Sequence, residues 1–215
     1  MSNIKYGLIS RVDSDTIEKT FELIFKDFPD EIINYSEVGL YNGRTTSGVN
    51  EFLQSKNKQF NLIGIDNFKD KEELVFYPPN AKLIQGSSIE VYNQLPDNSQ
   101  HFILIDGNHS FPYVIADFFC YSQKVIKGGY ICFHDAAPHS QNVSYQRMGS
   151  EDDMDMYISV RKALTAIGLM ENGTDSEGLY SMPSNECLFG GWELVFDEAD
   201  LNDMGGGVLV FKKLY

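Results

Sequence analysis

The sequence predicts an α/β fold: a Rossmann-like three-layer sandwich whose sheet is mostly parallel and closes with a C-terminal antiparallel strand pair. Two observations predict this class. Short apolar runs alternate with segments of helical length over residues 35–134, as in parallel sheets with helical crossovers. Two later strand-like runs, at residues 192–196 and 208–213, have no helical pattern between them, which indicates antiparallel pairing.

The composition is that of one globular domain, since 42% of the 215 residues are hydrophobic and 22% are charged. We therefore expect a single domain over residues 1–215. Cys120, Cys132 and Cys187 are odd in number and widely spaced, which predicts small buried side chains rather than disulfides or a zinc site. No apolar run approaches the roughly 20 residues of a membrane span, and no secretory signal is recognisable, so we expect a cytoplasmic protein.

The formal net charge of -14 restricts the expected partners. Such a charge repels phosphate backbones and anionic lipid surfaces, so we expect neither nucleic acid nor a membrane as partner. A small-molecule acceptor, neutral or cationic, fits better. No pattern in the sequence sets the oligomeric state.

The first expected element is a helix over about residues 13–28, started by Asp13 or Ser14. Its apolar side chains recur at helical spacing and form one stripe: Ile17, Phe21, Ile24, Phe25 and Phe28. This helix should pack on the sheet.

Five parallel strands are expected next, each an apolar run between polar residues, glycine or proline: Tyr35–Leu40, Asn61–Asp66, Ala81–Gln85, His101–Asp106 and Gly129–His134. Helices are expected over Thr45–Lys56 and Phe111–Ile126. Ligands of such sheets bind at the carboxyl ends of the strands, so the residues just after each strand are the candidates for a site.

The last part of the chain holds a loop and the closing strands. Residues 136–156 are rich in Ser, Asn, Gln and acids with little apolar periodicity, which predicts a mobile loop that could cover the site. The closing strands, Trp192–Phe196 and Val208–Lys213, are separated by an acidic segment and the glycines 205–207.

The turn after the first strand reads Glu37-Val-Gly-Leu-Tyr-Asn-Gly43. Glycine at this point lets the backbone approach a ligand, although a tight turn without a ligand is the alternative. A dehydrogenase would carry G-x-G-x-x-G here to seat a pyrophosphate. The acid at Glu37 repels pyrophosphate and suits a ligand with an ammonium group and ribose hydroxyls.

Asp66 ends the second strand, where a carboxylate can accept both hydrogen bonds of a ribose diol; a helix N-cap is the alternative. Ser88 follows the third strand and could meet the edge of an adenine. Asp106 and His109 follow the fourth strand, and His134 and Asp135 end the fifth. These four side chains should converge, and they could bind a divalent cation or transfer protons, unless they merely satisfy the core and cap helices.

Several motifs in order carry a family resemblance: E-V-G-L-Y-N-G-R-T-T, G-I-D, I-L-I-D-G-N-H-S, an acid at Asp117, and I-K-G-G-Y-I-C-F-H-D. The set resembles the class I S-adenosylmethionine-dependent methyltransferases. Its I-D-G-x-H and H-D motifs are similar to those of small-molecule O-methyltransferases of the catechol and macrolide-sugar types. The resemblance covers residues 35–135 and, more weakly, 160–164.

The resemblance implies S-adenosylmethionine as cofactor, with Glu37, Gly39 and Gly43 at its methionine and ribose, Asp66 at the ribose, and Ser88 at the adenine. It implies Asp106 and Asp135 as ligands of a metal such as Mg²⁺, and His134 stands beside them as a third candidate. His109 resembles the general base of some sugar-modifying relatives, and we expect it to act with Asp106 in catalysis.

Two residues depart from the family pattern. Ala136 stands where catechol-type enzymes have an amide ligand, and His134 stands where several sugar-type relatives have another acid. Metal binding is therefore left open by the sequence.

The resemblance implies methyl transfer to a hydroxyl, most simply that of a sugar or a phenol. One alternative is a nucleotide-linked oxidoreductase or sugar-nucleotide enzyme, which the missing third glycine and Glu37 disfavour. The other is a non-catalytic module that binds the cofactor, which the converging acids and histidines disfavour.

Overall fold

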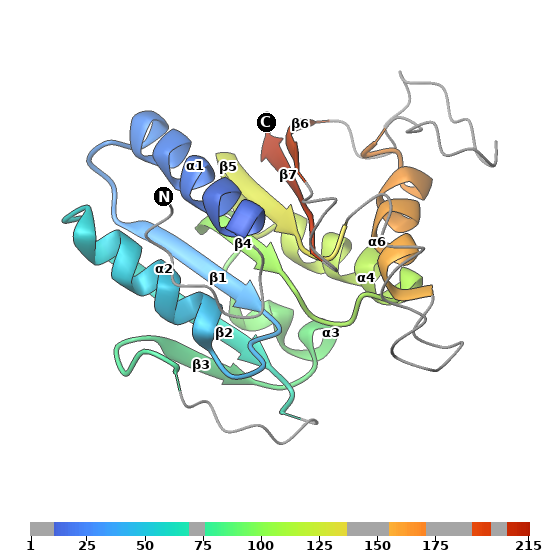
Figure 1. The fold of residues 1–215 in the computed structure, drawn as a ribbon, viewed down its shortest axis with the longest axis horizontal. Helices are drawn as coiled ribbons and strands as arrows, with labels where there is room; N and C mark the ends of the chain where they lie inside the picture. The colour runs from blue at the N-terminus through green and yellow to red at the C-terminus, as the bar shows by residue number, and fades with distance from the viewer. Residues whose placement is uncertain (1–10, 69–75, 137–154, 171–190, 199–205) are drawn as a thin grey trace.

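The computed structural model describes residues 11–68, 76–136, 155–170, 191–198 and 206–215. Its middle layer is a seven-stranded sheet in the order β3-β2-β1-β4-β5-β7-β6 (Figure 1). The strands are β1 Ile33–Val38, β2 Phe60–Asp66, β3 Lys82–Gln85, β4 Gln100–Ile105, β5 Val125–Phe133, β6 Trp192–Glu198 and β7 Val208–Lys213. The first five strands are parallel, and β7 is antiparallel to both β5 and β6, so the predicted fold class is confirmed.

Helices cover both faces of the sheet (Figure 1). They are α1 Arg11–Asp27, α2 Arg44–Ser55, α3 Ser88–Val91 with a 3-10 turn Tyr92–Gln94, α4 Phe111–Ser122 and α6 Asp155–Ala166. Side chains of α1 and α2 form one apolar core with the sheet, and side chains of α3, α4 and α6 form a second core on the opposite face. The three layers are therefore helices, sheet and helices.

The apolar stripe of α1 packs as predicted, because Ile17, Phe21 and Ile24 are fully buried. The ring of Phe21 lies 5.1 Å from that of Phe102 on β4. The expected start of the helix is wrong, since Asp13 lies within the first turn rather than before it. It is buried and faces the sheet, and the reason is a polar contact described below.

The boundary between α4 and β5 also differs from the prediction. The helix ends at Ser122 rather than near residue 126, and the strand already begins at Val125. The carbonyl of Lys124 accepts hydrogen bonds from the amides of Ser99 and Gln100, which draws the chain into pairing with β4. Apolar periodicity alone does not separate a helix end from a strand start over so few residues.

Several expectations fall partly outside the described residues. Most of the loop predicted at 136–156 lies there, and its last two residues already belong to α6. Cys120 and Cys132 are free thiols, the second of them buried, whereas Cys187 is not described. None of the helices in the described part of the chain is long and apolar enough to cross a bilayer.

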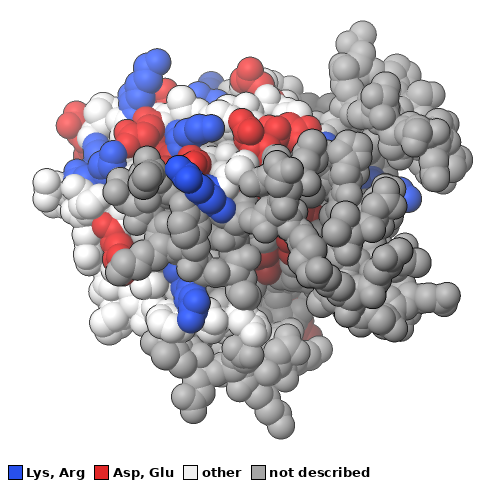
Figure 2. All heavy atoms as spheres, in the orientation of Figure 1, with Lys and Arg blue, Asp and Glu red and all other residues white. Residues whose placement is uncertain are grey.

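Side chains of both signs lie close together on the described part of the face that Figure 2 shows. Lys19 lies 4.0 Å from Glu198, and Lys56 pairs with Glu22 on α1. No single-sign basic patch covers the described residues of this face. The absence of a nucleic-acid partner stays a prediction.

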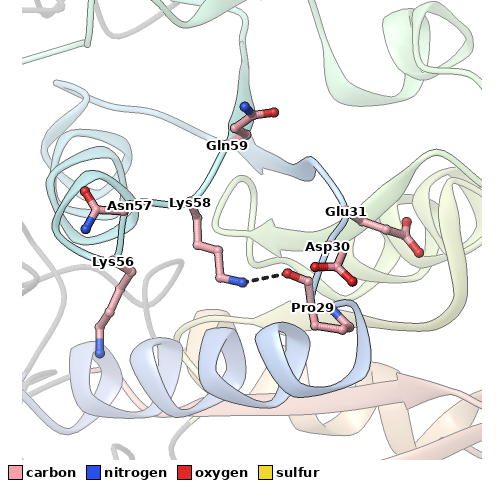
Figure 3. A pocket seen from close by; sticks show the side chains of 7 residues that line it. All are labelled: Pro29, Asp30, Glu31, Lys56, Asn57, Lys58 and Gln59. Carbon is pink, nitrogen blue, oxygen red and sulfur yellow. Dashed lines mark hydrogen bonds between the residues drawn. The ribbon is translucent and has the colours of Figure 1, made fainter.

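An open pocket of about 280 Å³ lies at the edge of the sheet where β1 and β2 begin (Figure 3). It is lined by Pro29, Asp30, Glu31, Lys56, Asn57, Lys58 and Gln59. The ammonium group of Lys58 donates a hydrogen bond to the carbonyl of Pro29 at 3.0 Å. The pocket is therefore remote from the carboxyl ends of the strands, where the candidate residues lie.

Candidate active site

The glycine turn after β1 lies against the turn after β4. Gly39 has a φ of +86°, and a Cβ there would lie 2.2 Å from the carbonyl oxygen of Asp106. The amide of Asp106 donates in turn to the carbonyl of Val38 at 2.7 Å. Only glycine fits this backbone contact, which brings the predicted cofactor turn next to the predicted catalytic acid.

Asp66 at the end of β2 holds the same turn. Its carboxylate accepts hydrogen bonds from the amides of Leu40 at 2.7 Å, Tyr41 at 3.3 Å and Phe68 at 2.6 Å. These bonds stabilise Tyr41 at a φ of 49°, a conformation that non-glycine residues rarely adopt. The side chain is half-buried, so Asp66 shapes the turn and stays partly accessible to solvent at the carboxyl end of β2.

Glu37 lies beneath the turn rather than on its surface. Its carboxylate is buried and accepts hydrogen bonds from the hydroxyls of Tyr35 at 3.1 Å and Thr46 at 2.6 Å. Burial raises the pKa of Glu37 to about 8, although the hydrogen bond from Thr46 opposes this. The structure thus brings Glu37 to the turn, but the partners of its carboxylate belong to the core, and its contact with a cofactor stays a prediction.

Ser88 begins α3, directly after β3. Its hydroxyl donates to the carboxylate of Asp117 on α4 at 2.6 Å, and its carbonyl accepts a hydrogen bond from the hydroxyl of Tyr121. Burial raises the pKa of Asp117 to about 6, against the hydrogen bond from Ser88. Ser88 therefore joins α3 to α4, and its predicted contact with an adenine stays a prediction.

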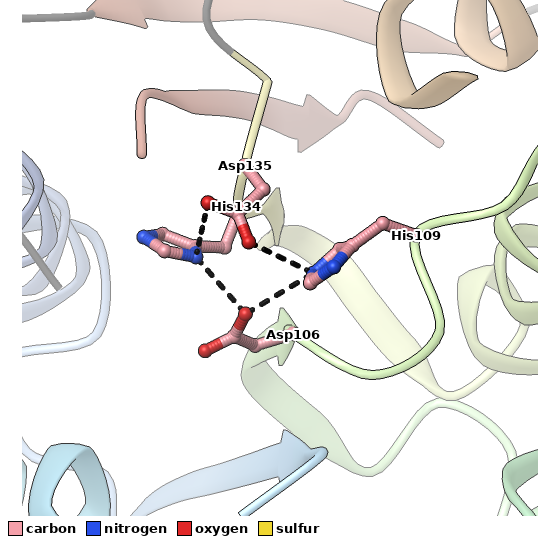
Figure 4. Close-up of side chains that lie close together, drawn as sticks. All are labelled: Asp106, His109, His134 and Asp135. Carbon is pink, nitrogen blue, oxygen red and sulfur yellow. Dashed lines mark hydrogen bonds and ion pairs between the residues drawn. The ribbon is translucent and has the colours of Figure 1, made fainter. Parts of the chain in front are cut away.

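Asp106, His109, His134 and Asp135 form one group, here called the acid–histidine cluster (Figure 4). One ligand atom of each lies within 4.8 Å of the others. The Nε2 atom of His109 lies 3.3 Å from Asp106 and 3.4 Å from Asp135. The Nδ1 atom of His134 lies 2.9 Å from Asp106 and 3.5 Å from Asp135. The structure confirms that these four residues converge.

The charges within the cluster depend on each other. Burial alone would raise the pKa of Asp106, but the two imidazoles beside it hold that pKa well below its usual range. Burial alone would lower the pKa of His134, yet the charges of Asp106 and Asp135 raise it well above its ordinary value. The pKa of His109 is raised too, because its hydrogen bond with Asp106 and the charge of Asp135 outweigh burial. The cluster is therefore built to hold positive charge between its carboxylates.

The donor set fits a divalent cation. It offers two carboxylates and two imidazoles, which are the groups that bind such ions in proteins. Mg²⁺ prefers oxygen ligands alone, whereas imidazole nitrogen suits ions such as Mn²⁺, Fe²⁺ and Zn²⁺. The cluster can thus accept Mg²⁺ with water as further ligand, and it suits Mn²⁺ at least as well.

One residue of the site is absent from the sequence predictions. Asp13 of α1 is fully buried, and one oxygen of its carboxylate lies 3.2 Å from Nε2 of His134. The signal was present in the sequence, because Asp13 precedes Ile17 and Phe21 at four-residue spacing on the apolar stripe. An acid on the buried face of a helix needs a polar partner within the core. A capping role would not account for a carboxylate at that position.

Comparisons with known proteins agree with this geometry. The model of a family described as a methyltransferase domain matches residues 36–136. The chain is 28% identical over 155 residues to an uncharacterised protein of Acanthamoeba polyphaga mimivirus, with 61% of this chain and 67% of that protein covered.

Solved structures with a similar fold include two methyltransferases. The O-methyltransferase from Bacillus cereus in complex with SAH has a TM-score of 0.57 at 11% identity, with 96% of this chain and 85% of that chain covered. The MycE methyltransferase of the mycinamycin biosynthetic pathway, in complex with Mg and SAH, has a TM-score of 0.55 at 15% identity; 97% of this chain matches 51% of that chain.

The fold and the family match together confirm the resemblance to the class I methyltransferases. Residues 36–136 match the model of a methyltransferase domain, and the matched segment contains both the glycine turn and the whole acid–histidine cluster.

Proposed function

We propose that the protein transfers the methyl group of S-adenosylmethionine to a hydroxyl of a small molecule, a sugar or a phenol. The observation that carries this proposal is the contact of Gly39 with the backbone of Asp106. It puts a turn of the cofactor-binding type directly beside a cluster of acids and imidazoles, which are the groups that can prepare a hydroxyl for attack.

The cofactor would lie over the turn. Gly39 and Gly43 allow the backbone to approach it, and Gly43 has a φ of +83° at the start of α2. Asp66 would accept hydrogen bonds from the ribose hydroxyls, since a carboxylate has lone pairs beyond those used by the three amides. Glu37 would support the turn from below, and Ser88 would lie at the adenine. The positively charged sulfonium fits the neighbourhood of these carboxylates better than a negatively charged pyrophosphate would.

His109 would act as the general base. In the transfer, the hydroxyl oxygen attacks the methyl carbon, the carbon–sulfur bond breaks, and the sulfur leaves with its electron pair as a neutral thioether. The hydroxyl proton passes to His109. Asp106 and Asp135 stabilise the imidazolium that forms, because both lie within 3.4 Å of Nε2.

Asp106, Asp135 and His134 would hold a divalent cation. Such an ion, when bound, lowers the pKa of the acceptor hydroxyl. The residues themselves orient the acceptor toward the turn, and His134 adds a neutral ligand where two charges already stand.

Binding of the cofactor can be tested by thermal shift with S-adenosylhomocysteine and with NAD. We expect stabilisation by S-adenosylhomocysteine alone; stabilisation by NAD alone would instead favour an oxidoreductase.

Turnover can be followed with methyl-labelled S-adenosylmethionine and a panel of sugars and phenols. His109→Ala should lower kcat by about 10²–10⁴-fold with S-adenosylhomocysteine affinity unchanged. Full turnover of this variant would show that His109 is not the base.

A further inference from the structure

Asp13 connects three parts of the molecule that are distant in sequence. One carboxylate oxygen, Oδ1, accepts a hydrogen bond from the amide of Gly207 at 3.0 Å, and the other, Oδ2, lies 3.2 Å from Nε2 of His134. The acid belongs to α1, the imidazole follows the last residue of β5, and the glycine precedes β7. A single buried carboxylate therefore holds two different segments.

The backbone around this carboxylate is closed into a ring. The carbonyl of Gly207 accepts a hydrogen bond from the amide of Ala136 at 3.0 Å, and Ala136 is two residues beyond His134. Arg161 of α6 donates to the carbonyl of Ala136 as well. The peptide that follows Asp135 is thus fixed on both sides, and Asp13 fixes the imidazole that precedes it.

Gly206, before β7, is explained by the same contact. Gly206 has a φ of +96°, and a Cβ there would lie 2.6 Å from Oδ2 of Asp13. A side chain at this position would displace the carboxylate. Gly206 is therefore needed where the carboxylate of Asp13 packs against the backbone, and it is more than a spacer between strands.

The hydrogen-bond chemistry decides which nitrogen of His134 carries hydrogen. An ionised carboxylate accepts hydrogen bonds and donates none, so both of its neighbours here must be donors. Gly207 donates through its amide, and His134 must donate through Nε2. The Nδ1 atom then faces Asp106 at 2.9 Å and Asp135 at 3.5 Å, within the acid–histidine cluster.

We propose that Asp13 is a positioning residue that fixes the orientation and tautomer of His134, so that Nδ1 is presented to a cation in the cluster. A carboxylate behind a ligating imidazole orients the ring and increases its basicity as a ligand. This inference rests on the cation site in the proposed function. It assigns to the N-terminal helix a part in a site otherwise built from the ends of β4 and β5.

The test compares Asp13→Asn with Asp15→Asn in the full chain. An asparagine offers one acceptor oxygen for two donors, so the Asp13→Asn variant would leave either Gly207 or His134 without an acceptor. Asp15 lies on the same helix but is partly exposed and pairs with Arg11 at 3.8 Å. We expect Asp13→Asn to weaken Mn²⁺ binding, measured by electron paramagnetic resonance, about 10–100-fold, and Asp15→Asn to leave it unchanged.

A double-mutant cycle separates positioning from a general structural role. In a His134→Gln background, Asp13→Asn should have little further effect on Mn²⁺ affinity, because its target imidazole is gone. An equal effect in both backgrounds would overturn the proposal, as would wild-type affinity in Asp13→Asn.

The wild-type protein provides a readout that needs no Asp13 variant to fold. With ¹⁵N-labelled histidine and Mg²⁺, nuclear magnetic resonance should show a slowly exchanging proton on Nε2 of His134, assigned by its loss in His134→Gln. A proton on Nδ1 instead would overturn the proposal. Failure of the wild-type protein to bind Mn²⁺ would also overturn the proposal. Binding of S-adenosylhomocysteine, measured in parallel, tests the proposed cofactor separately.

Discussion

Two histidines, at opposite edges of the sheet, form the same contact with an acid. Nε2 of His101 lies 3.2 Å from Glu31 at the edge where β4 begins, and Nε2 of His134 lies 3.2 Å from Asp13 at the edge where β5 ends. Both imidazoles have 5% of the side chain exposed. The difference is in their second nitrogen.

Nδ1 of His101 accepts a hydrogen bond from the backbone amide of Asn34 at 3.1 Å, so this imidazole is satisfied by the fold alone. Nδ1 of His134 faces two carboxylates, which have no hydrogen to donate. It needs a proton or a cation to make that contact favourable. An acid–histidine pair is therefore structural where the chain supplies a partner for both imidazole nitrogens, and a candidate metal ligand where one nitrogen faces only carboxylates.

The largest expected effect concerns the backbone at the two edges. Gly39→Ala places a Cβ 2.2 Å from the carbonyl oxygen of Asp106. Relieving this overlap requires a shift of the backbone at residue 39 or at residue 106, and either shift would move the site. We expect the free energy of unfolding to fall by about 3 kcal/mol or more, from overlap and the left-handed conformation together. Denaturant unfolding measures the change.

Gly128→Ala at the opposite edge is the matched control. Gly128 has a φ of +80°, but its Cβ would meet only the end of the Phe28 ring at 3.2 Å. We expect a loss of about 1–2 kcal/mol, from the backbone conformation alone. Equal losses for the two variants would show that the overlap with the carbonyl oxygen of Asp106 adds nothing to the cost of the left-handed backbone.

The second effect concerns two acids with opposite pKa shifts, the buried Asp117 and the exposed Asp27. Burial raises the pKa of Asp117 from 3.8 to about 6, so the native state retains a proton that the unfolded chain releases near pH 4. The contribution of Asp117 to stability therefore falls as pH rises from about 4 to 6, by about 3 kcal/mol. Asp117→Asn should remove this contribution, so the difference in unfolding free energy between wild type and variant should change by about that amount across the range.

Asp27 at the amino edge provides the opposite sign. Its hydrogen bond with Lys212 lowers its pKa, so it stabilises the protein above its unfolded pKa and loses that contribution as pH falls. Because the pair is partly exposed, Asp27→Asn should change stability by less than about 1 kcal/mol. If the stabilities of the wild type and of Asp117→Asn changed in parallel between pH 4 and 6, the raised pKa of Asp117 would be refuted.

Much of the fold was readable from the sequence, because strands that are buried on both faces form continuous apolar runs. Glycine after β1, and acids after β2, β4 and β5, then follow from the rule that ligands bind at the carboxyl ends. The convergence of Asp106, His109, His134 and Asp135 was predicted for this reason, since it depends only on strand order and direction.

Other parts of the site could not be read in this way. The burial of Glu37 depends on Thr46, which α2 brings over the strand, and the contact of Ser88 with Asp117 depends on how α3 meets α4. In the sequence, Asp13 fits the start of a helix, because an acid suits a cap as well as a buried contact. Its contact with His134 joins residues 121 positions apart, and no local pattern reports such a contact.

The last prediction tests the comparison of the two histidines directly. His134→Gln should weaken Mn²⁺ binding about 10–100-fold, because glutamine cannot present an imidazole nitrogen toward Asp106 and Asp135. His101→Gln should leave Mn²⁺ binding unchanged and lower stability by about 1 kcal/mol, because the amide of Asn34 loses its acceptor. Titration with Mn²⁺ and denaturant unfolding of the two variants measure both quantities. The two imidazoles have the same acid contact and the same burial, and they differ in the partner of Nδ1. If His101→Gln weakened Mn²⁺ binding as much as His134→Gln, the loss would therefore reflect general damage to the fold.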